Sequence, residues 1–377
     1  MSAEPEAKLL LRIPSSRHWQ EEAVTLVTQF TISRLLRFER MLREWDGPLS
    51  VTIYLTDASD IDALQSYLSD ESKLASFRKI ALTVVKPDYS INEEALVARL
   101  RYPINRLRNL ALDLAPTLFV LVTDVDFVPS PNMHTLLHTR GVPLILHPSA
   151  PTSSPTLYRT AIAISAFILS PSLSPSYPTT PSLLSSFLSS SPPLAALTDS
   201  NAGHGPSLPS LLFHAGPSGL SSLLDWPRKR WSYDVCYEPQ WEPYYLLHRA
   251  SHPLYDERFT DQGGDKQSHA LLLNALGFDF KILRDVWFMH PPKGEPGEDE
   301  WPSARLADPG EEGREMDDPT HFSNGQRDET RWRYFEDFLP ELERRWGANV
   351  RWPRGCSARV VGGRSFGRAK AGTIFGM

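Results

Sequence analysis

The chain has few cysteines, no long apolar run and no excess of basic charge. Only Cys236 and Cys356 occur among 377 residues, and two thiols cannot build a cysteine metal cage or a disulfide framework. We therefore predict that both are free, structural thiols, with a single bridge in an oxidising compartment as the alternative. The formal net charge of -6 argues against nucleic acid as a partner, since a nucleic-acid partner requires a basic face.

No stretch of about twenty apolar residues, the length needed to cross a bilayer, occurs in the sequence. The first sixteen residues contain a short apolar stretch preceded by acidic residues, which does not resemble a secretory signal. Taken literally, the sequence predicts a soluble, cytoplasmic chain without a transmembrane segment or an export signal. Its oligomeric state is not indicated by any pattern.

Strand-like and helix-like segments alternate over the first 150 residues, which predicts an α/β fold. The near-continuous apolar character of the strands indicates a mostly parallel sheet that helices cover on both faces. In such sheets ligands bind beyond the carboxyl ends of the strands. Asp124, which follows the last of these strands, is therefore expected in a functional site. The predicted strands are 23–30, 50–56, 79–85 and 117–123, and the predicted helices are 32–45, 60–77 and 93–114, the last interrupted at Pro103.

Serine and proline dominate the composition from about residue 149 to residue 226. Proline at this density disfavours a regular helix and serine favours local turns, so we predict a long flexible insertion at about 170–222. The apolar segment 160–169 is the exception, and we expect it to return to the core as a strand.

The remaining chain is predicted to complete a single domain over residues 20–350. Its features are a helix at 267–276, a strand at 278–283, an acidic, solvated loop at about 295–320, a last helix at 331–346 and a basic, disordered tail at 351–377.

Asp124 and Asp126, in LVTDVDF, are candidate metal ligands and Asp124 is also a candidate donor contact. Hard cations such as Mn²⁺ and Mg²⁺ prefer carboxylate oxygens, and such a cation neutralises charge that develops on a leaving diphosphate. An Asp-x-Asp pair alone is a weak signal, because turn-forming aspartates give the same pattern. The apolar flanks strengthen it, since acids wedged between buried segments need a partner.

His290 and Lys293, in WFMHPPK, follow the predicted strand. A neutral imidazole at His290 would complete the metal site, and Lys293 would meet a phosphate as a point charge. The alternatives are a hydrogen-bonded histidine at a strand end and an ordinary exposed lysine.

The segment YDERFTDQGGDKQSH supplies carboxylates for a general base, which direct displacement by an acceptor hydroxyl requires. Asp265 is the first candidate, and Asp256, Glu257 and Asp261 compete with it. The alternative for Asp265 is that it caps the following helix.

Six blocks in order resemble glycosyltransferase family 49, the group that includes the glucuronyltransferase domain of the LARGE enzymes. They are VTLVTQFTISRLLRFERMLREWDGPLSVTIYLTD, YPINRLRNLAL, FVLVTDVDFVPS, AIAISAFIL, YEPQWEPYYLLHR and PLYDERFTDQGGDKQSHALLLNALGFDFKILRDVWFMHPPK. Together they span roughly residues 23–293 without the Ser/Pro-rich insertion.

This resemblance implies a GT-A type fold, which is a Rossmann-like, mostly parallel mixed sheet flanked by helices. It implies an inverting enzyme that depends on Mn²⁺ (or Mg²⁺) and transfers a sugar from a UDP-sugar donor to a glycan or glycoprotein acceptor. Glucuronic acid is the sugar by analogy. The alternatives are another sugar such as xylose, galactose or N-acetylglucosamine, or a catalytically silent glycan-binding scaffold.

The family's metal ligands map onto Asp124, Asp126 and His290, and its donor-contacting block onto Asn105 and Arg108. The segment 241–244 matches a block on the acceptor side. The resemblance also implies that the chain works in the Golgi or secretory lumen. The membrane anchor of the animal members has no match in this sequence, and their Gly-Trp-Asn-Lys block is replaced by Gly264-Asp265-Lys266.

Overall fold

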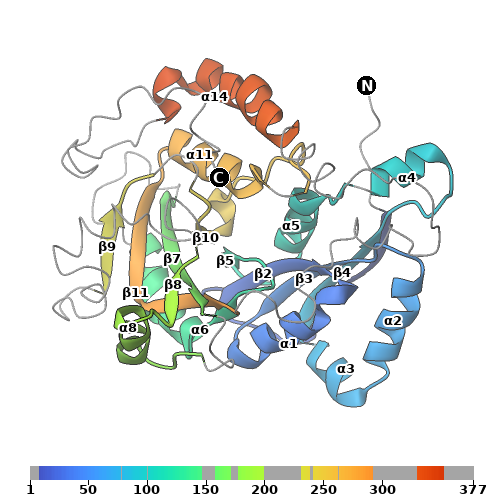
Figure 1. Ribbon diagram of the computed structural model, residues 1–377, viewed down its shortest axis with the longest axis horizontal. Coiled ribbons are helices and arrows are strands. Elements are labelled where there is room, and N and C mark those ends of the chain that lie inside the picture. Colours follow the sequence, from blue (N-terminus) through green and yellow to red (C-terminus); the bar gives the residue numbers. More distant parts are fainter. Residues whose placement is uncertain are drawn as a thin grey trace.

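The computed structural model describes residues 8–77, 79–99, 101–146, 158–170, 177–198, 231–237, 241–261, 263–291 and 329–351. Its strands join into one sheet (Figure 1). They are β1 (Lys8–Ile13), β2 (Val24–Thr31), β3 (Leu49–Tyr54), β4 (Ile80–Lys86), β5 (Phe119–Val122), β6 (Val128–Pro129), β7 (Thr160–Leu169), β8 (Ala195–Leu197), β9 (Ser232–Val235), β10 (Tyr244–His248) and β11 (Asp279–His290).

The helices of the described residues mostly connect consecutive strands, as expected for an α/β fold. They are η1 (Ile32–Arg34), α1 (Leu35–Glu44), α2 (Ser59–Leu68), α3 (Glu71–Phe77), α4 (Glu93–Arg99), α5 (Ile104–Asp113), α6 (Met133–Leu136), η2 (Leu137–Gly141), α7 (Val142–Leu146), α8 (Pro181–Ser189), η3 (Arg249–Ser251), α11 (Asp265–Ala275), η4 (Arg333–Phe338), α14 (Leu339–Trp346) and η5 (Ala348–Arg351).

The sheet is mixed, with a parallel core in the order β4-β3-β2-β5. Next to β5 lies β10, which is antiparallel to both β5 and β7, and β7 in turn is parallel to β11. The short strand β6 pairs antiparallel with β11, with Met289 opposite Val128. This register brings the end of β11 beside the loop that follows β5.

Side chains that alternate along each strand pack against helices on opposite faces of the sheet. In β2, Leu26 and Phe30 belong to the core cluster that α1, α2 and α3 complete, whereas Val27 packs with α5. In β10, Leu246 joins the first cluster and Leu247 packs against α11 and α14. Helices therefore cover both faces (Figure 1), and the predicted α/β sheet is confirmed.

Most predicted elements are confirmed, including the return of 160–169 to the core as β7. The helix predicted over 60–77 is two helices, α2 and α3, and the edge strand β1 was not predicted. Pro103 separates α4 from α5, as expected. The predicted acidic loop lies outside the described residues, as does the tail beyond Arg351.

Two expectations are corrected. A regular helix, α8, forms within the Ser/Pro-rich segment, because Pro181 occupies its first turn, where no backbone N–H is needed, and the Thr180 hydroxyl accepts from the Leu183 N–H. Cys236, expected to be a free thiol, is disulfide-bonded. The other cysteine, Cys356, lies outside the described residues.

Candidate functional site

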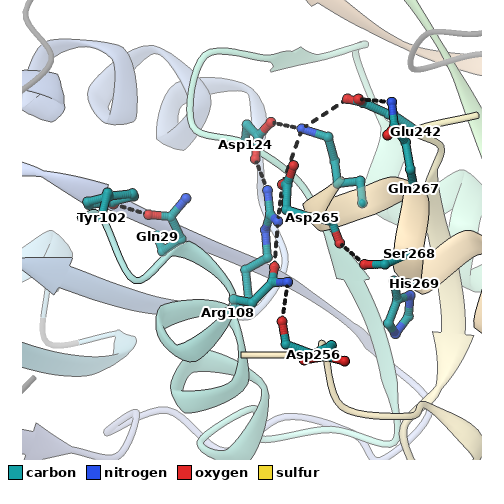
Figure 2. Close-up of polar contacts among 12 residues, drawn as sticks. Gln29, Tyr102, Arg108, Asp124, Glu242, Asp256, Asp265, Gln267, Ser268 and His269 are labelled. Atoms are coloured by element: carbon teal, nitrogen blue, oxygen red, sulfur yellow. Dashed lines mark hydrogen bonds and ion pairs between the residues drawn. The ribbon is translucent and has the colours of Figure 1, made fainter. Parts of the chain in front are cut away.

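Four structural elements meet at the carboxyl end of β5, where the sequence placed the candidate chemistry. The loop after β5 carries Asp124 and Asp126, and the first turn of α5 carries Asn105. The segment before β10 carries Glu242, and α11 begins with Asp265. Figure 2 shows Asp124, Asp265 and Glu242 gathered above Arg108.

Arg108 is the centre of this cluster and its side chain is only 1% exposed. Its guanidinium donates to Asp265 at 2.5 Å, to Asp124 at 2.8 Å and to the side-chain oxygen of Asn105 at 3.0 Å. A buried arginine needs such partners, because an unpaired buried charge costs several kcal/mol. The face of the Tyr255 ring lies 5.3 Å from the guanidinium carbon and adds a cation–π contact.

Asp124 receives donors from three separate elements of the fold. Besides Arg108 on α5, the Tyr244 hydroxyl of β10 donates to it at 2.7 Å and the Lys266 ammonium of α11 at 2.8 Å. Burial lowers the pKa of Lys266, but the charges of Asp124 and Asp265 outweigh burial and hold that pKa above its ordinary value. The lysine is therefore a fixed cation beside the carboxyl end of β5.

Asp265 lies at the first position of α11, and its side chain is 3% exposed. Burial raises its pKa, but the charges of Lys266 and Arg108 more than compensate, so the pKa lies below the ordinary value. The N-cap residue of α11 is Gly264, which has no side chain to cap the helix. Asp265 thus enters the cluster as a buried, ionised partner of Arg108.

Glu242 was not proposed as a site residue, yet it lies in the same cluster. It accepts from the Gln267 side chain at 2.9 Å, and its other oxygen lies 3.6 Å from the Lys266 ammonium (Figure 2). Burial raises the pKa of Glu242 to about 7, against the opposing effect of Lys266.

Asp126 is held by two arginines that follow β2. Arg37 donates to one carboxylate oxygen at 2.8 Å, and Arg34 forms a short ion pair with the other. The partners that this acid between two apolar segments requires are therefore arginines. Neither arginine was predicted, since both lie about 90 residues away in sequence.

His290 ends β11 and lies beside the loop that carries the two aspartates. Its ring is 5.2 Å from the ring of Phe127, which stands between Asp126 and Val128 in sequence. The Nδ1 atom lies 2.6 Å from the carbonyl oxygen of Pro291. Because a carbonyl only accepts, Nδ1 is the donor in this contact, so Nε2 is the ring nitrogen that a neutral imidazole would offer to a metal.

The fit of these residues to a divalent cation is partial. Two carboxylates and an Nε2 lone pair form a donor set that suits Mn²⁺, and each carboxylate oxygen has two lone pairs, which leaves room beside the present ion pairs. Among the described residues, however, no group of three His, Cys, Asp or Glu side chains is arranged to hold a metal. The donor chemistry fits, and the ligands are not preassembled.

The remaining predicted residues lie around the cluster. Asn105 donates to the backbone carbonyl of Asp256, whose carboxylate is bound by Arg258, and Asn109 donates to Glu257 at 2.8 Å. Burial raises the pKa of Asp261 to about 6, and its carboxylate accepts from the Tyr102 N–H. Glu257 and the Asp256 backbone thus contact α5, and Asp261 contacts the segment before α5. Lys293 lies outside the described residues.

Comparison with known proteins supports the resemblance stated above. A sequence model described as "Glycosyl-transferase for dystroglycan" (family 49) matches residues 69–140 and 226–305. The chain is 31% identical over 278 residues to "Xylosyl- and glucuronyltransferase LARGE2" of Mus musculus, covering 72% of this chain and 35% of that protein. It is 28% identical over 274 residues to "Glycosyltransferase-like protein gnt14" of Dictyostelium discoideum, covering 71% and 37%.

The resemblance to family 49 is thus confirmed. The chain spans about a third of the length of these relatives. Among solved structures, S. aureus TarS matches at a TM-score of 0.33 over 71% of this chain and 60% of that chain. GalNAc-T7 with UDP, GalNAc and Mn²⁺ matches at 0.39 over 86% and 58%, and both are 11% identical in sequence. No helix of the described residues is long and apolar enough to cross a membrane.

Proposed function

We propose that this member of the family 49 group transfers a sugar from a UDP-sugar to a hydroxyl of a glycan, with inversion at the anomeric carbon. The observation that carries the proposal is the convergence on Asp124 of Arg108, Tyr244 and Lys266, from three elements, at the carboxyl end of β5. In α/β sheets this edge is where ligands bind. A fixed cluster of paired charges there suits a ligand that is itself charged, such as a nucleoside diphosphate.

In this proposal Asp124, Asp126 and His290 hold Mn²⁺ or Mg²⁺. When bound, the ion supplies Lewis-acid neutralisation of the charge that develops on the leaving diphosphate. Lys266, fixed beside Asp124, offers a second positive charge to the phosphates. Arg108, which donates to the side-chain oxygen of Asn105, also donates to Asp124 and so orients that carboxylate before the donor arrives.

The donor sugar is proposed as glucuronic acid, because the relatives are named xylosyl- and glucuronyltransferases. Xylose, galactose and N-acetylglucosamine are the alternatives. We further propose that the chain works in the Golgi or secretory lumen. The disulfide at Cys236 supports this compartment, because disulfides form and persist in oxidising environments.

The test is release of UDP from a panel of UDP-sugars by the purified chain, with Mn²⁺ and with EDTA. One sugar should turn over only with metal, and Asp126→Ala should abolish that turnover. The control is Asp279→Ala, which removes an exposed carboxylate at the start of β11 and should leave the rate unchanged. If no sugar is cleaved and no UDP binds with Mn²⁺ present, the proposal is wrong, and a catalytically silent glycan-binding scaffold becomes the better description.

A further inference from the structure

An acceptor hydroxyl must lose a proton when it displaces UDP, so the proposed reaction needs a carboxylate that solvent and acceptor can reach. The general base must come within hydrogen-bond distance of that hydroxyl. Apart from Asp126, which Arg34 and Arg37 hold, six acids of the described residues lie in or beside the cluster: Asp124, Asp256, Glu257, Asp261, Asp265 and Glu242. These acids differ in their exposure and in the partners that bind their carboxylates.

Asp265 is the least accessible of the six. Its side chain is 3% exposed, and Arg108 binds its carboxylate at 2.5 Å. Proton uptake there would leave the buried guanidinium of Arg108 with one partner fewer, which is costly. This burial favours a structural role for Asp265 over the role of base.

The other predicted candidates are occupied by local contacts. Both carboxylate oxygens of Asp256 accept from Arg258, and Glu257 accepts from the Asn109 side chain. Asp261 is buried and accepts from the Tyr102 backbone N–H. Asp124 accepts from three cationic or hydroxyl donors and is a proposed metal ligand.

Glu242 combines partial exposure with a position beside Lys266 and the proposed donor site, whereas the exposed Glu257 contacts Asn109 instead. Its side chain is 22% exposed, against 3% for Asp265, and the Lys266 ammonium lies 3.6 Å from the Glu242 carboxylate. Gln267 donates to one of its oxygens at 2.9 Å and so orients the carboxyl. The backbone around it is fixed, because the neighbouring Trp241 and Tyr244 are 1% and 2% exposed.

We infer that Glu242 is the general base of the sugar transfer, an inference that rests on the proposed function. The acceptor oxygen forms its bond to the anomeric carbon as the bond between that carbon and the β-phosphate oxygen breaks. The electron pair of the broken bond leaves with UDP, and the hydroxyl proton passes to the Glu242 carboxylate. Gln267 is a positioning residue, since it acts only through Glu242.

The charges that face Glu242 come from every neighbouring element of the site. Lys266 on α11 and Arg108 on α5 favour the ionised carboxylate, whereas Asp265 on α11 and Asp124 after β5 oppose ionisation. Burial has the largest effect, and it raises the pKa of Glu242 to about 7. A base with a pKa near the working pH is ionised often enough to act and still holds a proton well.

The experiment compares the wild type with Glu242→Gln, which keeps the shape and the contact with Gln267 but cannot take a proton. The readouts are UDP binding with Mn²⁺, the donor KM, and kcat for UDP release to water between pH 5.5 and 8.5. The donor is the UDP-sugar that the wild type turns over. Water replaces the acceptor, and its proton takes the same path. Glu71→Gln, an exposed glutamate at the start of α3, is the matched control.

Glu242→Gln should bind UDP and show a donor KM close to the wild-type values, while kcat falls by about 100- to 10,000-fold. The wild-type kcat should fall as the pH drops through about 7, because protonated Glu242 cannot accept the hydroxyl proton. This decrease of kcat at low pH should be absent from Glu242→Gln. Gln267→Ala should lose less activity than Glu242→Gln and should keep the decrease of kcat at low pH. These results would support the inference.

A Glu242→Gln variant with kcat within a few-fold of wild type and an unchanged pH profile would overturn the inference and leave the proposed function standing. A variant that loses UDP binding in step with activity would assign Glu242 to the structure of the site and also overturn it. A wild type that neither binds UDP nor cleaves any UDP-sugar would refute the proposed function, and the inference with it.

Discussion

Replacing Arg108 with methionine should strongly destabilise the fold, because it leaves a buried charge without its main partner. Arg108 is 1% exposed and joins Asp265, which is 3% exposed, to Asp124. After Arg108→Met, the nearest remaining cation to Asp265 is Lys266, 3.9 Å away. Removing one partner of a buried ion pair costs about 3–5 kcal/mol in the free energy of unfolding.

The control for this prediction is Arg43→Met, the same substitution at an exposed site. Arg43 is 73% exposed and lies 4.0 Å from Glu39 one helical turn away, so its loss should cost about 0.5 kcal/mol or less. The double variant Arg108→Met/Asp265→Asn should recover a large part of the Arg108→Met cost, because it removes the stranded charge as well.

Urea unfolding at pH 7 and at pH 4.5 measures these differences. In the wild type the pKa of Asp265 is lowered, so its contribution to stability is present above the ordinary carboxyl pKa and is lost as the pH falls through the folded value. In the variant that pKa should be raised, and protonation at low pH relieves the penalty. The difference in the free energy of unfolding between the wild type and Arg108→Met should therefore be smaller at pH 4.5 than at pH 7. A cost below 1 kcal/mol at pH 7, or a difference that widens in acid, would refute the reasoning.

Three further outcomes are expected. Gly264→Ala should lower the free energy of unfolding by at least about 1–2 kcal/mol and reduce kcat, since Gly264 has φ of +72° and an added Cβ would lie 2.9 Å from Thr330 and 3.1 Å from the Phe259 ring; a neutral result in urea unfolding would contradict this. Thr180→Ala should cost about 1 kcal/mol in the same assay, because its hydroxyl accepts from the Leu183 N–H at the start of α8, whereas an unchanged midpoint would show that the cap is dispensable. Calorimetry should find that UDP strengthens Mn²⁺ binding and that Mn²⁺ strengthens UDP binding by the same factor; tight Mn²⁺ binding without UDP would show a preassembled metal site.

The core of the fold was predictable because its strands are apolar on both faces. Every side chain of β2 and β3 is buried, because helices cover both faces of the sheet. The sequence there is rich in apolar and β-branched residues, which is typical of buried strands. The edge strand β1 was not predictable in this way. All six of its residues are exposed, and its pairing with β4 depends on backbone hydrogen bonds that leave no periodic pattern.

The positions of Asp124 and His290 were predictable because each follows an apolar segment of the sequence, and their roles as metal ligands stay predictions. The site was not predictable where partners come from distant elements. Glu242 and Tyr244 precede or begin a strand whose neighbours, β5 and β7, are fixed only by the sheet order. No local signal distinguishes a glutamate that lies next to Lys266 from any other acid before a strand, and only the packed sheet brings the two together.

Charge balance explains how this cluster can serve a charged ligand without a preassembled metal site. With Glu242 ionised, the site holds four carboxylates and four cationic side chains, which are Asp124, Asp126, Asp265 and Glu242 against Arg34, Arg37, Arg108 and Lys266. A divalent cation alone would upset this balance, and so would a diphosphate alone, because either adds uncompensated charge in a partly desolvated space. A cation that arrives with the two negative charges of a diphosphate adds none. Arg34 and Arg37 pair with Asp126, and Lys266 pairs with Asp124. If the two aspartates held a metal ion, the same basic groups would be in place to meet the phosphates.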